Sequence, residues 1–95
     1  YANTSKVSTS QFASGSIIEG QVANSVLSRN IHVHKDSLVK DSILFPRVVI
    51  GEGAQVEYAI LDKGVEVADG VVIRGTAEHP VVVKKGSKVT EDIHS

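Results

Sequence analysis

The sequence contains no cysteine, no methionine and no tryptophan, and only two prolines. Without cysteine the chain can form neither disulfides nor thiolate metal sites. No apolar run approaches the roughly 18 residues that a membrane-spanning helix requires, and no signal-peptide pattern is present. The formal net charge of −1 is not the basic excess typical of nucleic-acid binders and polybasic membrane anchors. We therefore expect binding to neither nucleic acid nor a membrane.

The chain is rich in aliphatic residues. Hydrophobic residues make up 41% of its 95 residues, but aromatic residues make up only 4%. Valine and isoleucine pack well on a pleated surface, so this bias favours strands. The length allows one small domain at most. Because the chain lacks methionine and begins at Tyr1, we expect it to be a piece of a longer protein, with part of the function located elsewhere.

Apolar residues recur at every seventeenth position along much of the sequence. Within each period they are spaced by six, five and six residues, which suits three short strands per turn. In such a hexapeptide-type repeat each coil buries its inward residues against the coil below. Two of the apolar columns are Val22, Val39, Val56 and Ile73, and Val33, Ile50 and Val67.

This spacing predicts an all-β fold, a single-stranded parallel β-helix built from about four 17-residue coils. We expect an extended lead-in over residues 1–11, coils over 12–75, and a capping strand with a polar tail over 76–95. The capping strand is Val81-Val82-Val83. Parallel crossovers are right-handed by default, and only the resemblance to hexapeptide-repeat proteins favours a left-handed coil.

Five ordered segments resemble the C-terminal β-helix of bacterial ADP-glucose pyrophosphorylase. The resemblance covers roughly residues 12–89, in the family's order and spacing. Val81 lies only eight positions after Ile73, where the family's catalytic subunit usually carries a longer insertion. The chain is therefore most similar to the D-type, regulatory-like subunit. The segments are Gly15–Gly20, Asn24–Leu27, Val49–Ala54, Ala59–Val65 and Asp69–Ile73.

The resemblance implies a role as an oligomerisation and regulatory domain in bacterial glycogen biosynthesis, in the cytoplasm. The family converts ATP and glucose 1-phosphate to ADP-glucose and pyrophosphate, with Mg²⁺, in an N-terminal nucleotidyltransferase domain that is absent from this chain. No glycine-rich nucleotide loop occurs in these residues, so the chain alone is expected to be non-catalytic and to need no cofactor. Its expected partners are its own N-terminal catalytic domain and other pyrophosphorylase subunits.

Three cations fall on one corner of the predicted coil. In the 17-residue register, Arg29, Arg47 and Lys63 lie along one edge on successive coils. Guanidinium and ammonium groups pair well with phosphate, so this edge is a candidate anion site, against the alternative of a solvated corner. The resemblance adds Lys84, because Lys63 and Lys84 match segments that hold effector-binding lysines in plant relatives. A sugar phosphate is the expected effector.

Two further groups of residues invite a function. The side chains of Phe45, Val49 and Tyr58 are predicted to point outward and could form an apolar patch for subunit contact, against the alternative of scattered surface residues. His32 and His34 flank the inward Val33 and therefore point the same way. Zinc normally requires a third protein ligand, so we interpret them as a solvated pair and predict no metal site.

Two other hexapeptide-repeat functions stay open as alternatives. A γ-type carbonic anhydrase needs three zinc-binding histidines at a spacing that this chain does not have. A hexapeptide acyltransferase needs a general-base histidine at an intersubunit cleft and a long loop that holds coenzyme A. The tight predicted coils leave no such loop.

Overall fold

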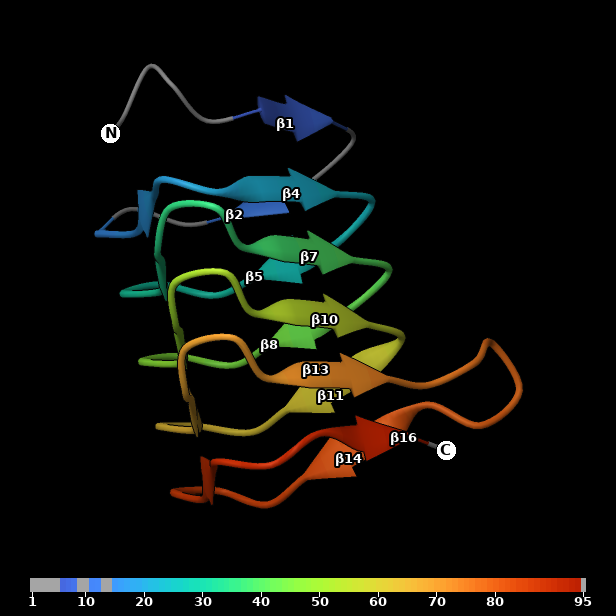
Figure 1. The fold of residues 1–95 in the computed structure, drawn as a ribbon. Helices are drawn as coiled ribbons and strands as arrows, with labels where there is room; N and C mark the ends of the chain where they lie inside the picture. Colours follow the sequence, from blue (N-terminus) through green and yellow to red (C-terminus); the bar gives the residue numbers. More distant parts are fainter. Residues whose placement is uncertain (1–5, 9–10, 13–14, 95) are drawn as a thin grey trace.

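The computed structural model describes residues 6–8, 11–12 and 15–94, which form a parallel β-helix (Figure 1). The strands fall into three parallel sheets, one on each side of a triangular coil, which we name faces A, B and C. Face A contains β1 (Lys6–Ser8), β4 (Gln21–Ala23), β7 (Leu38–Lys40), β10 (Gln55–Glu57), β13 (Val72–Arg74) and β16 (Ile93–His94). Face B contains β2 (Gln11–Phe12), β5 (Val26–Leu27), β8 (Ile43–Leu44), β11 (Ala59–Leu61) and β14 (Val81–Val83). Face C contains β3 (Ile17–Ile18), β6 (His32–Val33), β9 (Val49–Ile50), β12 (Glu66–Val67) and β15 (Lys88–Val89).

The coil is left-handed. In Figure 1 the strands of face A lie nearest the viewer and point to the right, and the chain returns behind them as it descends. Successive strands of each face pair in parallel, and Val56 lies beside Val39, its counterpart in the preceding coil of the predicted repeat. The predicted all-β, left-handed β-helix with a 17-residue period is confirmed.

The interior of the coil is filled by aliphatic side chains that alternate with outward ones along each strand. Val39 on face A, Leu44 on face B and Ile50 on face C are each 0% exposed. Burying such a side chain contributes roughly 1.5–3 kcal/mol to stability. No buried side-chain nitrogen or oxygen of the described residues lacks a hydrogen-bond partner. The core is therefore one continuous aliphatic column along the coil axis.

The coil continues beyond the boundary expected from the sequence. Residues 84–94, predicted as part of a polar tail, contain β15 and β16, which pair with β12 and β13. The strand Val81–Val83 pairs with β11, so it begins a further coil and does not end the helix. The reason is the loop 75–80. A regular coil would place Thr76 beside Ala59, but Ala59 pairs with Val81, so the loop displaces the repeat without ending it.

The first coil is shorter than the later ones. Ile17 pairs with His32, whereas a regular coil would place His34 beside it. Part of the expected lead-in is strand, since β1 pairs with β4 and β2 pairs with β5. The rest of the lead-in, residues 1–5 and 9–10, lies outside the described residues.

The corners of the coil require left-handed backbone conformations. The same corner position has positive φ in successive coils, which is the conformation that glycine, asparagine and aspartate tolerate best. Between faces A and B these residues are Asn24, Asp41 and Tyr58, and between faces C and A they are Asp36, Gly53 and Gly70. Between faces B and C they are Gly15, Asn30, Arg47, Gly64 and Gly86.

Across residues 6–8, 11–12 and 15–94, no helix is long and apolar enough to cross a membrane.

Candidate functional site

The corner between faces B and C gathers most of the cations that the sequence singled out. We name it the basic corner, and it comprises two columns. Each column contains residues that occupy the same position in successive coils. Backbone hydrogen bonds between coils fix this alignment. Gly64 N–H donates to the Pro46 carbonyl at 3.0 Å, and Gly86 N–H donates to the Lys63 carbonyl at 2.9 Å. One column is Arg29, Pro46, Lys63 and Lys85, and the other is Asn30, Arg47, Gly64 and Gly86.

Arg47 occupies a position that costs backbone energy. Its φ is 66°, whereas the later coils place glycine at this position. A residue with a Cβ in the left-handed region is disfavoured by roughly 1–2 kcal/mol. Backbone strain of this kind is enriched at active sites and ligand-binding sites.

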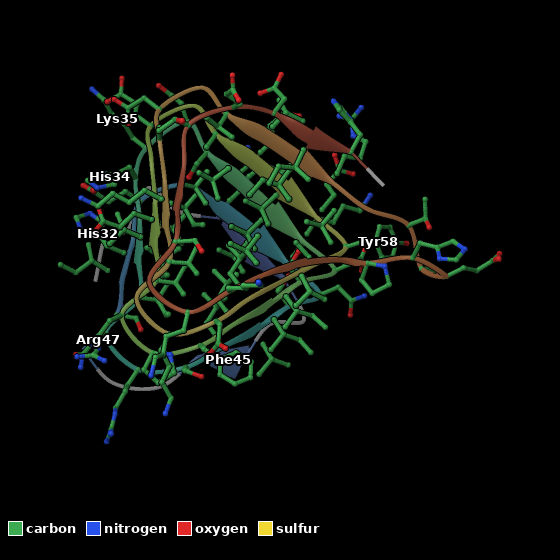
Figure 2. The ribbon with its side chains drawn as sticks, turned by 90° about the horizontal axis from the view of Figure 1, so that it is seen from below. His32, His34, Lys35, Phe45, Arg47 and Tyr58 are labelled. Atoms are coloured by element: carbon green, nitrogen blue, oxygen red, sulfur yellow. The ribbon has the colours of Figure 1, made fainter. Side chains whose placement is uncertain are left out.

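Arg29, Arg47 and Lys63 surround one shallow groove of about 460 Å³, together with Asn30 and Pro46. All three cationic side chains are exposed. Within residues 15–94, none of them forms an ion pair. Figure 2 shows Arg47 projecting from its corner into solvent. The structure thus brings these three predicted residues together.

Two further lysines lie near this groove. Lys84 was predicted, whereas Lys85 was not predicted as a member of the basic corner. Leu61 pairs with Val83, so Lys84 follows the strand beside Asp62, and Lys85 falls beside Lys63. Because the loop 75–80 adds residues to its coil, the 17-residue period does not align Lys85 with Lys63. Counting from β14 instead of from the 17-residue period would have placed Lys85 in the column.

Asp62 is the acidic neighbour of this corner. Its Oδ1 accepts a hydrogen bond of 2.7 Å from the backbone N–H of Lys63. The carboxylate is therefore engaged by the turn and not by a cationic side chain among the described residues. An exposed set of guanidinium and ammonium donors around a shallow groove can bind a phosphate or another small oxyanion.

The predicted apolar patch of Phe45, Val49 and Tyr58 is not one surface. Phe45 follows β8 at the end of face B, while Val49 lies on face C, beyond the corner that Arg47 occupies. Tyr58 precedes β11, at the opposite end of face B, because the strands of this face run parallel. Figure 2 shows Phe45 and Tyr58 well separated. The three residues were predicted from outward orientation alone, which does not tell which side of a triangular coil each one occupies.

Face B carries a different apolar surface. Val26, Ile43 and Val82 are 48%, 42% and 67% exposed. They lie in one row across the sheet with Ile60, which is half-buried. The sequence contained a signal for this apolar surface. In a doublet of apolar residues on a strand, one member faces inward and the other must face outward. Such doublets recur at Val26-Leu27, Ile43-Leu44 and Ile60-Leu61.

His32 and His34 point outward from face C, as predicted (Figure 2). The other two histidines lie elsewhere, His79 in the loop 75–80 and His94 in β16. Among the described residues no three histidines gather, so the carbonic anhydrase alternative gains no support. The longest segment without a strand in residues 15–94 is 75–80, which is short for a loop that holds coenzyme A.

Comparisons with known proteins place this geometry in a family. Residues 2–92 match the family described as GlmU-like, C-terminal hexapeptide. The glucose-1-phosphate adenylyltransferase of Hydrogenovibrio crunogenus is 44% identical over 62 residues, which is 64% of this chain and 15% of the relative. That of Bacillus cytotoxicus is 41% identical over 73 residues, 77% of this chain and 19% of the relative. The glycogen biosynthesis protein GlgD of Bacillus subtilis is 38% identical over 86 residues, 90% of this chain and 25% of the relative.

These relatives confirm the resemblance to ADP-glucose pyrophosphorylase, the common name of glucose-1-phosphate adenylyltransferase. The chain spans only 15% to 25% of the length of these relatives. The family match extends over nearly all of the residues, and the fold is the coil that a hexapeptide repeat forms. The chain therefore belongs to the GlmU-like, C-terminal hexapeptide family.

Proposed function

We propose that the chain is the non-catalytic C-terminal domain of a glucose-1-phosphate adenylyltransferase subunit, of the D-type regulatory kind, in glycogen biosynthesis. The observation that carries the proposal is the similarity to both adenylyltransferases and GlgD along one coil. The relatives are several times longer than the chain, so the formation of ADP-glucose from ATP and glucose 1-phosphate with Mg²⁺ belongs to an N-terminal catalytic domain. The expected cytoplasmic location stays part of this proposal.

The first role of the domain is to hold the parts of the enzyme together. Face B supports this role, because Val26, Ile43 and Val82 present a row of exposed aliphatic side chains. Contiguous exposed apolar surface is typical of protein contacts. We assign to face B the contact with the catalytic domain or with another pyrophosphorylase subunit.

The second role is to bind an anionic effector at the basic corner. Arg29, Arg47 and Lys63 line one groove without ion pairs among the described side chains, and Lys84 lies beside it. A sugar phosphate fits this chemistry, because its phosphate can accept hydrogen bonds from several cations at once. The remainder of such a site belongs to the catalytic domain.

The assembly role is tested on the full heteromeric enzyme that contains the complete polypeptide carrying these residues. Ile43→Lys places a charge on face B and is expected to lower the oligomeric mass in sedimentation velocity, together with the rate of ADP-glucose formation. Ile17→Lys is the matched control, because Ile17 is 47% exposed on face C and Ile43 is 42% exposed on face B. Equal effects of the two variants would count against a contact through face B.

The regulatory role is tested by titrating the same heteromeric enzyme with sugar phosphates. Lys63→Ala and Lys84→Ala are expected to shift the activation curve to higher effector concentration while leaving the unstimulated rate unchanged. Lys40→Ala on face A is the control for a simple change in net charge. An activation curve that coincides with that of the unmodified protein would remove the basic corner from regulation.

A further inference from the structure

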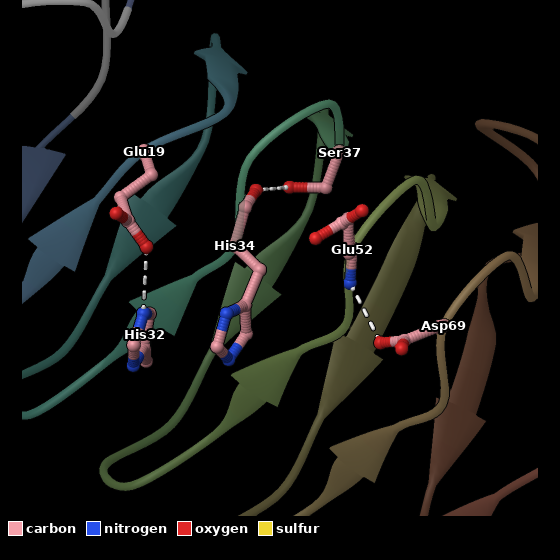
Figure 3. Close-up of polar contacts among 6 residues, drawn as sticks. All are labelled: Glu19, His32, His34, Ser37, Glu52 and Asp69. Carbon is pink, nitrogen blue, oxygen red and sulfur yellow. Dashed lines mark hydrogen bonds and ion pairs between the residues drawn. The ribbon is translucent and has the colours of Figure 1, made fainter.

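Glu19, His32 and His34 bring three potential metal ligands together on face C (Figure 3). One ligand atom from each side chain lies within 4.8 Å of the other two. Glu19 Oε1 and His32 Nε2 are 3.0 Å apart, and the rings of His32 and His34 stack with their centroids 3.8 Å apart. The glutamate belongs to the preceding coil, so the cluster forms only when the two coils stack.

The backbone that carries the three side chains is held firmly. Glu19 N–H donates to the Val33 carbonyl at 2.8 Å, and His34 N–H donates to the Ile50 carbonyl at 3.0 Å. Val33 lies between the histidines and is 0% exposed, which anchors β6 in the core and turns both imidazoles outward.

The corner next to the cluster is also closely packed. The hydroxyl of Ser37 donates a hydrogen bond to the carbonyl of His34. A Cβ on Gly20, the residue after Glu19, would lie 2.7 Å from that same carbonyl oxygen. Glycine at this position lets the two coils approach, and this approach brings Glu19 to the histidines.

We propose that Glu19, His32 and His34 bind one divalent transition-metal ion of the zinc class. Imidazole nitrogen and carboxylate oxygen are normal zinc ligands, and two histidines with one glutamate are a known ligand set in sites that keep an open position. Imidazoles also favour zinc, copper and nickel over magnesium and calcium. Glu19 is exposed and both histidines are half-buried, so water completes the coordination.

Binding of an ion requires the two stacked imidazoles to rotate, because the lone pairs of nearly parallel rings do not converge on one point. Zinc–nitrogen distances of about 2.0–2.1 Å place tetrahedral ligand atoms about 3.4 Å apart, and the three ligand atoms already lie within 4.8 Å. The ion takes the place of the proton between Glu19 and His32. Only side-chain torsions change, because the backbone of each residue is held by its neighbouring coil.

The cluster is confined to these two coils. In the next coil Val49 pairs with His32, and Gly51 follows two residues later, where this coil has His34. Neither residue can ligate a metal. A surface ion pair of glutamate and histidine contributes little to stability, so this cluster adds little to the folding energy of the coil.

The test is a calorimetric titration of the full chain with Zn²⁺. We expect one equivalent to bind, and Glu19→Gln and His34→Ala each to weaken binding by at least about tenfold, the lower limit for losing even an outer partner of a ligand. Glu66→Gln and His79→Ala are matched controls that leave binding unchanged. Glu66 lies on face C two coils away, in register with His32 through Val49.

Imidazole NMR signals provide a readout on the unmodified chain that does not depend on the stability of any variant. Signals of His32 and His34 should shift on addition of Zn²⁺, while those of His79 and His94 should not. Absence of saturable binding, or affinity that is equal in Glu19→Gln, His34→Ala and His79→Ala, would overturn the proposal. The titration needs no nucleotide or effector, so its outcome is independent of the proposed function.

Discussion

The backbone N–H of Ser42 donates a hydrogen bond to the hydroxyl oxygen of Ser25, 3.1 Å away in the preceding coil. One coil further on, the hydroxyl of Ser42 accepts from the N–H of Ala59 at 3.2 Å. Each hydroxyl also donates, Ser25 to the Ala23 carbonyl and Ser42 to the Lys40 carbonyl. These buried serines therefore join three successive coils at the corner between faces A and B.

Ser42→Ala is expected to lower the free energy of unfolding by about 1–3 kcal/mol, because the buried N–H of Ala59 loses its acceptor. Urea denaturation followed by circular dichroism measures this loss. Ser87→Ala is the control, since the Ser87 hydroxyl makes no side-chain hydrogen bond to the described residues, and its effect should stay within about 0.5 kcal/mol. Equal losses in the two variants would show that the serine contacts do not stabilise the stack.

Tyr58→Asn is expected to raise the free energy of unfolding by up to about 1 kcal/mol, because asparagine tolerates the left-handed backbone that other residues adopt at a cost. Tyr58 has a φ of 48°, and the equivalent corner residues Asn24 and Asp41 have φ values of 49° and 51°. Thermal unfolding is the measurement, and Tyr58→Leu is the control that keeps the strain. A lower melting temperature for Tyr58→Asn than for Tyr58→Leu would contradict the strain argument.

Deletion of residues 76–80 is expected to leave the coil folded. Gly75 N–H donates to the Glu57 carbonyl at 2.8 Å, one coil after the equivalent bond from Tyr58 to Lys40, so Gly75 already occupies the corner position. After the deletion Val81 would follow Gly75 as Ala59 follows Tyr58, which restores the 17-residue spacing. Shortening a loop changes closure entropy slowly, so stability should change by less than about 1 kcal/mol in urea denaturation. Loss of the strand signal in circular dichroism would contradict this register.

Val83→Ala is expected to destabilise the chain by about 1–3 kcal/mol, through lost burial and an added cavity, whereas Val82→Ala should have little effect. Val83 is 7% exposed and Val82 is 67% exposed, although the two are neighbours in β14. Urea denaturation of both variants makes the comparison. Similar losses would mean that the C-terminal coil is not packed in the register described above.

Lys85→Ala is expected to weaken the binding of inorganic phosphate to the basic corner as much as Lys63→Ala does, because the two lysines occupy one column. Phosphate titration followed by NMR measures the affinity, and the affinity should fall with added salt, since exposed charges are screened. Lys40→Ala on face A is the control. Equal affinities in Lys85→Ala and Lys40→Ala would exclude Lys85 from the anion site.

Much of the fold could be predicted because a solenoid repeats one local rule. The spacing of Val39, Leu44 and Ile50 placed one aliphatic residue inward on each face, and all three are fully buried. The prediction stopped one coil early at the loop 75–80. Five additional residues at a corner do not disturb the stacking of strands, but they shift every later column in the sequence.

The 17-residue period could locate some of the candidate sites but not others. The period alone predicted that Arg29, Arg47 and Lys63 share one edge, because their coils are regular. The period could not predict that Glu19 lies near His34, because the first coil is shorter than the repeat. Lys85 was missed because the loop 75–80 makes the coil before it longer than the repeat.

By itself, the sequence determined that this chain is a parallel β-helix with inward and outward residues assigned along each strand, and only the resemblance to known families favoured the left-handed sense. Only the tertiary structure decided which side of the coil each outward residue occupies, and which outward residues are neighbours where a coil departs from 17 residues. It separated Phe45, Val49 and Tyr58. It also aligned Ile60 with Val82 across the loop 75–80 and brought Glu19 to His32 across the short first coil. The reason is physical. Burial follows from local alternation along a strand, whereas proximity on the surface depends on the number of residues in each coil, and a loop or a short coil alters that number.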